Sequence, residues 1–361
     1  MRIGVPKEIK NHEYRVGLTP ASVSELSAAG HKVFIQTQAG MGIDFSDADY
    51  IEAGATIVAT AAETFANADM IVKVKEPQPV EIAMLEARHT LFTYLHLAPD
   101  PEQAKGLMKS GATCIAYETV TANNGSLPLL KPMSEVAGRM SVQVGAHYLE
   151  KEQGGRGVLL GGVPGVPPAR VAILGGGVSG VNAAQMAVGM RADVTIYDIN
   201  NDRLAELDMF FSSQIKTAYA SKAAIAAAVA RAHLVIGAVL VPGAAAPKLV
   251  TREMLRTMKR GSVLVDIAID QGGCFETSHA TTHDNPVFVE EGVIHYCVAN
   301  MPGAVARTSA FALNNATLPF ALRLANHGAE GAMAADPHLA NGLNVMGGKI
   351  MHKAVADALG F

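Results

Sequence analysis

The chain has 361 residues, of which 49% are hydrophobic and 17% charged, so it can bury sizeable cores and wholesale disorder is excluded. At roughly 150 residues per domain, this length predicts about two domains. The formal net charge of −4 argues against a general binder of nucleic acid or anionic membranes, because such a protein presents a basic face. The three cysteines, Cys114, Cys274 and Cys297, lie far apart, which predicts reduced thiols, a cytoplasmic location and no metal site.

No targeting or membrane-spanning segment is expected. The N-terminal residues Met1–Lys7 lack the apolar core of a secretory signal. The longest apolar stretch, residues 223–250, is interrupted by Arg231 and Pro242, whereas a spanning helix needs about 20 apolar residues in a row. We therefore expect a helix followed by a strand in this stretch, and no membrane partner.

The first third of the chain alternates short apolar runs with helical patterns. Thr19 and Pro20 supply a cap and a first-turn proline for the first helix. The expected strands are residues 33–35, 70–74 and 91–97, and the expected helices are residues 20–29, 61–66 and 101–110. Such alternation predicts βαβ units and a mainly parallel sheet.

The middle of the chain predicts a second sheet of the same kind. An amphipathic helix over residues 134–153 runs into a stretch rich in glycine and proline, residues 154–168. Beyond it we expect a helix at residues 180–190 and strands at residues 170–174, 193–197, 234–241 and 262–267. This order is typical of a doubly wound nucleotide-binding domain.

The tail begins with a helix over residues 309–326, in which Pro319 predicts a kink. About 50 residues are too few for a separate core, so the tail is expected to pack on the N-terminal region. The prediction is an α/β protein of two Rossmann-like, doubly wound domains with a cleft between them. The domain built from both ends of the chain comprises residues 1–132 and 309–361, and the nucleotide-binding domain comprises residues 133–308.

A glycine-rich turn follows the strand at residues 170–174. Gly175, Gly177 and Gly180 match GxGxxG, in which glycines permit a tight turn, close approach of a pyrophosphate and close packing of helix on strand. Asp198 ends the next strand, where a carboxylate accepts hydrogen bonds from ribose hydroxyls and repels a 2′-phosphate. Arg203 lies nearby and could tolerate that phosphate or stack on adenine, but NAD is the favoured cofactor.

Four polar residues lie where expected strands end or loops begin: Arg15, Lys75, His96 and Asp270. An arginine fork is suited to binding a carboxylate, and a histidine titrates near neutral pH. Each also has an ordinary structural explanation: a surface arginine, a solvated lysine, a core histidine or a strand-end aspartate. Periodicity alone leaves both explanations open for all four.

Five motifs resemble one known family. They are GVPKEIKNHEYRVGLTP at residues 4–20, PMSEVAGRM at 132–140, the glycine loop through Asp198, DIAIDQGG at 266–273 and NMPG at 300–303. The chain is thereby identified as a member of the family of alanine dehydrogenases and the NAD-binding part of proton-translocating transhydrogenases, over essentially its whole length. Two positions depart from the family: Gly17 stands where alanine is usual, and His279 where an arginine that contacts the cofactor is common.

The resemblance implies roles for individual residues. Arg15 and Lys75 would bind the substrate carboxylate and carbonyl oxygen, and His96 and Asp270 would be the catalytic pair. The cofactor-binding set would be Ser134, Gly175, Gly177, Val178, Ser179, Gly180, Asp198, Arg203, Val239, Leu240, Ile267, Asp270, Asn300 and Met301.

The activity so implied is reversible oxidative deamination of L-alanine by NAD to pyruvate, ammonium and NADH, in a cytoplasmic homohexamer that serves L-alanine catabolism. Two alternatives remain. One is the NAD-binding portion of a transhydrogenase, against which the MSEVAGRM motif argues. The other is an NAD-sensing regulatory or scaffolding protein, against which the four intact polar residues argue.

Overall fold

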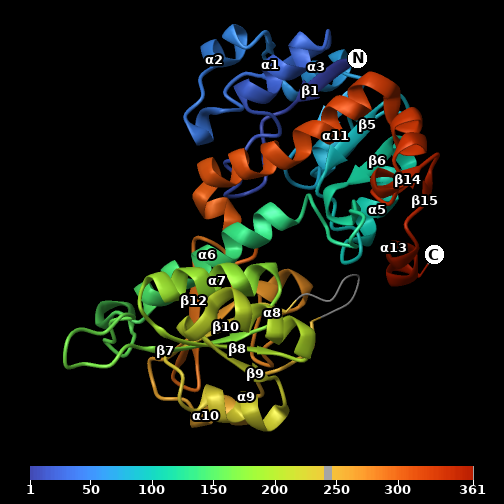
Figure 1. Cartoon of the computed structure of the whole chain (residues 1–361). Helices are drawn as coiled ribbons and strands as arrows, with labels where there is room; N and C mark the ends of the chain where they lie inside the picture. Colours follow the sequence, from blue (N-terminus) through green and yellow to red (C-terminus); the bar gives the residue numbers. More distant parts are fainter. Residues whose placement is uncertain (240–245, 361) are drawn as a thin grey trace. The chain divides into compact units, whose positions relative to one another are not determined.

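The computed structural model describes residues 1–239 and 246–360 and divides the chain into two compact units (Figure 1). The first unit joins Met1–Met133 to Val305–Phe361, and the second is Ser134–Ala304. The first unit is therefore discontinuous in sequence, and each unit contains one sheet of its own.

The sheet of the first unit has the strand order β15-β14-β6-β5-β4-β1-β2-β3. β1 to β6 are parallel, and β14 and β15 extend the sheet in antiparallel pairings. The strands are β1 (Arg2–Val5), β2 (Lys32–Gln36), β3 (Thr56–Val58), β4 (Met70–Val72), β5 (Thr90–Thr93), β6 (Thr113–Ala116), β14 (Leu343–Met346) and β15 (Lys349–Ile350). The helices are α1 (Pro20–Ala28), α2 (Asp47–Glu52), α3 (Ala61–Asn67), α4 (Pro79–Ile82), α5 (Pro101–Ser110), α11 (Ala306–Ala335), α12 (Pro337–Ala340) and α13 (Lys353–Leu359), with 3₁₀ turns η1 (Met41–Ile43) and η2 (Tyr117–Thr119).

Local sequence explains these elements. The central strands β4 and β5 are buried at every residue, which is why they are continuous rather than alternating in polarity. α1 begins where expected, because the Thr19 side chain accepts the Ser22 N–H at 3.4 Å and Pro20 occupies the first turn. α3 packs on β1 and β2, and α1 packs on β2 and α11. The tail therefore belongs to the first unit.

The sheet of the second unit has the order β12-β13-β11-β10-β7-β8-β9, and all of its pairings are parallel except that of β12 with β13. Its strands are β7 (Arg170–Leu174), β8 (Asp193–Asp198), β9 (Lys216–Tyr219), β10 (Leu234–Gly237), β11 (Val263–Asp266), β12 (Val287–Glu290) and β13 (Val293–Tyr296). The α-helices are α6 (Lys131–Tyr148, which begins in the first unit), α7 (Val178–Gly189), α8 (Asn201–Phe211), α9 (Lys222–Val229) and α10 (Arg252–Thr257). The described residues of this unit also form the 3₁₀ turns η3 (Lys151–Gln153), η4 (Ser212–Gln214), η5 (Ile267–Gln271) and η6 (Met301–Val305). Figure 1 shows α7 and α8 on one side of the sheet and α9 and α10 on the other, so the unit is doubly wound.

Several predicted boundaries are wrong. Two strands end earlier than predicted, β4 at Val72 and β5 at Thr93. Backbone hydrogen bonds between the two segments continue for one residue beyond each strand, and carboxylates then accept the N–H groups of Val74 and His96. The helix predicted over residues 134–153 is α6, which begins and ends earlier. The strand predicted over residues 234–241 ends at Gly237, and its last two predicted residues lie outside the described residues.

The helix predicted over residues 309–326, with a kink at Pro319, is longer in the structure. α11 runs from Ala306 to Ala335 with Pro319 inside it, and its non-helical backbone falls at Gly328, with φ 69° and ψ 169°. These angles lie in a region that is essentially restricted to glycine. The non-helical backbone inside α11 therefore falls at a glycine and not at the proline.

Candidate active site

The first unit places Arg15, Lys75 and His96 beyond the carboxyl ends of neighbouring strands. Arg15 follows β1, Lys75 follows β4 and His96 follows β5. β1 lies between β2 and β4, so the strand order reverses direction at β1. Ligands of doubly wound sheets bind at such a switch point, outside the carboxyl ends of the strands.

Arg15 is a buried ion-pair residue and not the surface arginine that the loop sequence allowed. It is 2% exposed, and its Nε and Nη2 donate to the two carboxylate oxygens of Glu13 at 2.6 and 2.5 Å. Nη1 lies 3.0 Å from the sulfur of Met133. Burial opposes the positive charge, but the hydrogen bonds and charge of Glu13 outweigh it and raise the pKa of Arg15. The guanidinium is thus held charged in a fixed orientation.

Lys75 is buried rather than solvated. It is 8% exposed, and its ammonium lies 3.6 Å from the carboxylate of Glu76. Its carbonyl accepts the Thr93 hydroxyl at 3.0 Å, which links the segment after β4 to the end of β5. A buried ammonium at this position is suited to binding an anionic group.

His96 adopts a strained backbone with φ 48°, which is uncommon for a residue other than glycine. The carboxylate of Glu118 holds this turn by accepting the N–H groups of Leu95 at 3.1 Å and His96 at 2.6 Å. The ring stacks on Tyr94, with centroids 5.7 Å apart and planes 8° apart, and its Nδ1 lies 4.0 Å from Glu118. The side chain is 36% exposed, so His96 is not a core histidine.

The glycine loop of the second unit lies at that sheet's own switch point, between β7 and β10. Gly175 has φ 105°, and a Cβ there would lie 2.7 Å from the carbonyl oxygen of Ala238, beside Val239. A Cβ on Gly180 would lie 1.9 Å from the oxygen of Gly175, so this position requires glycine. A Cβ on Gly177 would meet nothing within 4 Å, which leaves open space at the N-terminus of α7.

Asp198 and Arg203 both contact the loop. Asp198 accepts the Gly176 N–H at 2.7 Å, and Arg203 Nε donates to the Gly176 carbonyl at 2.8 Å. Arg203 also pairs with Glu206 at 2.6 Å. The carboxylate and the guanidinium therefore hold the backbone N–H and the carbonyl of one loop residue, Gly176.

The PMSEVAGRM motif forms the start of α6, which packs on the glycine loop. The Ser179 hydroxyl donates to the Ser134 carbonyl at 3.0 Å. A Cβ on Gly138 would lie 2.2 Å from the Ser179 oxygen, so the motif glycine permits this close approach. Within this unit the structure thus brings Ser134 beside Ser179.

The DIAIDQGG motif forms η5 after β11. Buried Asp266 accepts the N–H groups of Ala268 and Cys274 at 3.1 and 2.9 Å and the Ser278 hydroxyl at 2.5 Å. Desolvation raises the pKa of Asp266, and these donors oppose that rise. This cap positions η5, on which Ile267 is half-buried and Asp270 is exposed.

The remaining predicted cofactor residues are not all described. Asn300 has φ 64° and its carbonyl lies 3.2 Å from His283 Nε2, and Met301 begins η6. Leu240 lies outside the described residues. His279, one of the two positions at which the sequence departs from the pattern it resembles, stacks on Phe288 with centroids 3.7 Å apart.

The acids that hold these residues in place, Glu8, Glu13, Glu118 and Asp266, were not predicted from the sequence. Glu8 and Glu13 lie in the motif at residues 4–20, and Asp266 begins the motif at residues 266–273. A charged motif at or directly after a buried strand was the available signal for these three. No sequence pattern marks Glu118, because its role depends on the pairing of β5 with β6.

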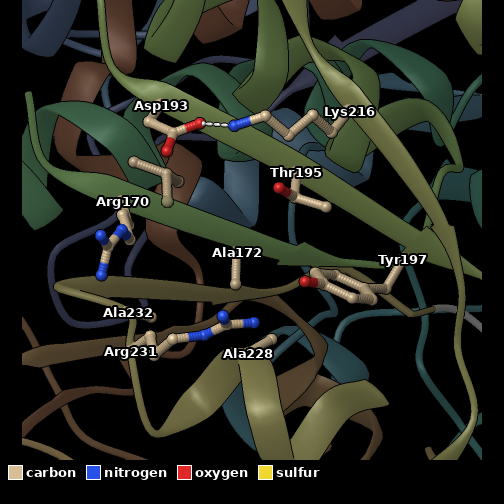
Figure 2. A pocket seen from close by; sticks show the side chains of 10 residues that line it. Arg170, Ala172, Asp193, Thr195, Tyr197, Lys216, Ala228, Arg231 and Ala232 are labelled. Atoms are coloured by element: carbon tan, nitrogen blue, oxygen red, sulfur yellow. Dashed lines mark hydrogen bonds and ion pairs between the residues drawn. The ribbon is translucent and has the colours of Figure 1, made fainter.

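A hollow of about 270 Å³ on the second unit does not coincide with these residues. It is lined by the first residues of three strands, Arg170, Asp193 and Lys216, together with Arg231 and Tyr197. Figure 2 shows Asp193 facing Lys216, and their charged groups are 2.5 Å apart. The glycine loop follows the opposite end of β7, so this hollow is not the predicted cofactor site.

Among residues 1–239 and 246–360, no helix combines the length and the hydrophobicity that are needed to span a bilayer. The same residues contain no group of three or more His, Cys, Asp or Glu side chains arranged to hold a metal ion.

Comparison with known proteins places the chain in a family. The model of the N-terminal domain of the alanine dehydrogenase/PNT family matches residues 4–137, and that of the C-terminal domain matches residues 141–353. The chain belongs to this family.

Its relatives are similar over their full length. The chain is 61% identical to alanine dehydrogenase of Halomonas elongata, covering 100% of this chain and 97% of the relative. It is 56% identical to alanine dehydrogenase of Bacillus subtilis, with 100% and 95% covered. A solved L-alanine dehydrogenase superposes with a TM-score of 0.96 at 55% identity, covering 99% of each chain. A transhydrogenase from Sinorhizobium meliloti gives 0.82 at 26% identity, covering 98% and 100%.

Proposed function

We propose that this protein is an NAD-dependent alanine dehydrogenase, which converts L-alanine and NAD reversibly to pyruvate, ammonium and NADH. One observation carries the proposal. Arg15, Lys75 and His96, far apart in the sequence, lie beyond the ends of three adjacent strands. The carboxylates of Glu13 and Glu118 hold Arg15 and His96 in place. The high identity to alanine dehydrogenases favours this substrate over that of the more distant transhydrogenase.

The second unit fits a dinucleotide. The loop from Gly175 to Gly180 leaves open space at the N-terminus of α7, where N–H groups and the helix dipole favour a pyrophosphate. Asp198 is suited to the ribose hydroxyls and disfavours a 2′-phosphate. Arg203 is already bonded to Gly176 and Glu206, so it is not poised to receive that phosphate. We therefore propose NAD as the cofactor.

Other residues would complete the cofactor site. When bound, NAD supplies the acceptor for the hydride from the substrate Cα. The residues that would hold it are those of the glycine loop and its neighbours: Ser134, Gly175, Gly177, Val178, Ser179, Gly180, Asp198, Arg203, Val239, Leu240, Ile267, Asp270, Asn300 and Met301.

The first unit would bind the substrate. The guanidinium of Arg15, oriented by Glu13, would bind the carboxylate of alanine or pyruvate, and the ammonium of Lys75 would bind the same end and the carbonyl oxygen. Two cations fixed in the folded protein position the substrate without reorganisation during the reaction. Binding at two points also orients Cα.

His96 would carry the proton transfers. The substrate amine must be neutral before a hydride leaves Cα, and water must lose a proton as it adds to the resulting imine. A half-exposed imidazole held at a fixed turn by Glu118 is suited to both transfers. Asp270, on η5 of the second unit, would orient or share the proton as the second member of the catalytic pair.

The oligomeric state, cellular location and partners are proposed from membership of the family. We propose a cytoplasmic homohexamer that takes only small-molecule substrates, without nucleic-acid or membrane partners, and serves L-alanine catabolism. The domain assignment, residues 1–132 with 309–361 for substrate and 133–308 for NAD, is part of the same proposal. The hexamer is checked by light scattering of the purified protein.

The activity is tested by the absorbance of NADH formed from NAD and L-alanine at alkaline pH. NADP and L-serine are run in parallel. Formation of NADH with L-alanine and NAD alone supports both substrate and cofactor. Binding of NAD without NADH formation would favour the transhydrogenase-like or NAD-sensing alternative.

A further inference from the structure

The carboxylate of Glu8 connects the two segments that carry the proposed substrate-binding residues. Glu8 follows β1, is 7% exposed and accepts hydrogen bonds from three donors of the segment after β4. These are the ammonium of Lys73 at 3.0 Å and the backbone N–H groups of Val74 at 2.7 Å and Lys75 at 3.4 Å. Because β1 and β4 are adjacent parallel strands, one side chain spans both of their carboxyl ends.

Other groups also hold the segment of residues 73–75, but they bond to its carbonyls and to the Lys73 ammonium, and not to the N–H groups that Glu8 accepts. The Lys73 carbonyl accepts the Tyr117 hydroxyl at 3.0 Å, and the Lys75 carbonyl accepts the Thr93 hydroxyl at 3.0 Å. The ammonium of Lys73 has a second carboxylate partner, Glu81, at 2.7 Å. Loss of Glu8 would therefore leave Lys73 paired but remove the acceptor from the N–H groups next to the Lys75 side chain.

Glu8 also interacts electrostatically with Arg15. Burial raises the pKa of Glu8, Lys73 opposes that rise, and the nearby carboxylates of Glu13 and Glu81 reinforce it. The negative charge of Glu8 in turn favours the charged form of Arg15. All five of these side chains are almost completely buried, so their interactions are weakly screened.

We propose that Glu8 is a positioning residue for substrate binding, which fixes the backbone at Lys75 and, together with Glu13, the charge environment of Arg15. This inference rests on the proposed function, in which Arg15 and Lys75 bind the substrate carboxylate. Because Glu8 acts through these residues and lies in the first unit, its loss should weaken substrate binding and leave NADH binding unchanged.

The experiment compares Glu8→Ala and Glu8→Gln with the parent protein in pyruvate reduction. For Glu8→Ala, kcat/KM for pyruvate is expected to fall at least about tenfold, mainly through KM. Glu8→Gln keeps an oxygen that accepts the Val74 N–H, so it should restore part of that loss. The Kd for NADH, measured by fluorescence, should stay within about twofold of the parent value.

Glu81→Gln is the matched control, because it removes the other carboxylate from Lys73 without contacting Val74 or Lys75. It should leave KM for pyruvate near the parent value, even where the melting temperature falls. Equal rises of KM in Glu8→Gln and Glu81→Gln would mean that Glu8 only neutralises Lys73, and an unchanged KM in Glu8→Ala would also overturn the proposal. An inactive parent that binds NADH would instead overturn the proposed function, and with it this role.

Discussion

The backbone of His96 has a strained conformation, which determines the direction of its imidazole ring. Its positive φ would relax in an isolated peptide, but Glu118 binds two consecutive N–H groups and Tyr94 covers one face of the ring. Strained residues of this kind persist where surrounding contacts over-determine them and are common at functional sites. The strain at His96 therefore supports its proposed role in proton transfer.

His96→Ala is expected to lower kcat at least about 10²-fold, because a positioned acid–base group contributes about 10²–10⁴ in rate. The Kd for NADH should not change, since the glycine loop belongs to the other unit. Imidazole added to the assay should restore part of the turnover. Turnover within a few-fold of the parent would contradict the assignment of His96.

The buried side chain of His295 is expected to make the stability of the second unit depend on pH. It lies on β13, is fully buried, and its Nδ1 and Nε2 contact the Val293 carbonyl at 3.0 Å and the Thr277 hydroxyl at 2.8 Å. Because a carbonyl only accepts, Nδ1 carries a proton, and a neutral ring can accept the Thr277 hydroxyl proton at Nε2. Burial lowers the pKa of His295 to about 4.

The neutral form is thus favoured in the folded state, and its stabilising effect is complete above the unfolded pKa of about 6.5. As the pH falls from about 6.5 toward 4, this stabilising effect is lost, and the free energy of unfolding decreases by up to about 3 kcal/mol. Urea unfolding, followed by circular dichroism between about pH 7 and about pH 4, should reveal this loss of stability. His295→Gln should be less stable at neutral pH but show a shallower slope, and parallel slopes would exclude His295 as the source.

Among the elements, the turn from β7 into α7 depends most directly on glycine. Gly180→Ala would place a Cβ 1.9 Å from the Gly175 oxygen, in the backbone of the loop itself. The loop or the helix must shift, so NADH affinity should fall at least about tenfold and the melting temperature should drop. Isothermal titration and thermal unfolding measure the two effects.

Gly189→Ala is the control in the same helix. A Cβ there meets nothing within 4 Å, and alanine is a better helix former than glycine by up to about 1 kcal/mol. This variant should bind NADH like the parent and melt at the same or a higher temperature. If Gly180→Ala behaved in the same way, close packing of the loop on α7 would not be required.

For the whole molecule, the tail completes the first core. The Asn314 oxygen in α11 accepts the Thr19 N–H at 2.8 Å and the Ser22 hydroxyl at 2.9 Å, and β14 pairs with β6. A chain that ends after Ala304 should therefore lose cooperative unfolding of the first unit. Limited proteolysis should then leave a resistant fragment from the second unit, Ser134–Ala304. Resistance of residues 1–133 in that shortened chain would contradict this dependence.

Much of the molecule was predictable from local patterns. The sequence by itself determined the family, the α/β class, the two mainly parallel sheets and the glycine loop, because apolar runs, caps and required glycines are local properties of the chain. It also singled out Arg15, Lys75 and His96. Periodicity misjudged where β4 and β5 end, since a strand continues only as far as a neighbour supplies its hydrogen bonds.

Only the tertiary structure decided which carboxylates hold the candidate site. Glu8 reaches the segment after β4, and Glu118 reaches the turn at His96, through contacts between residues far apart in the chain. It also decided that Gly328, not Pro319, interrupts α11. Such contacts follow from strand order and burial, which depend on the whole fold and leave no periodic mark on the sequence.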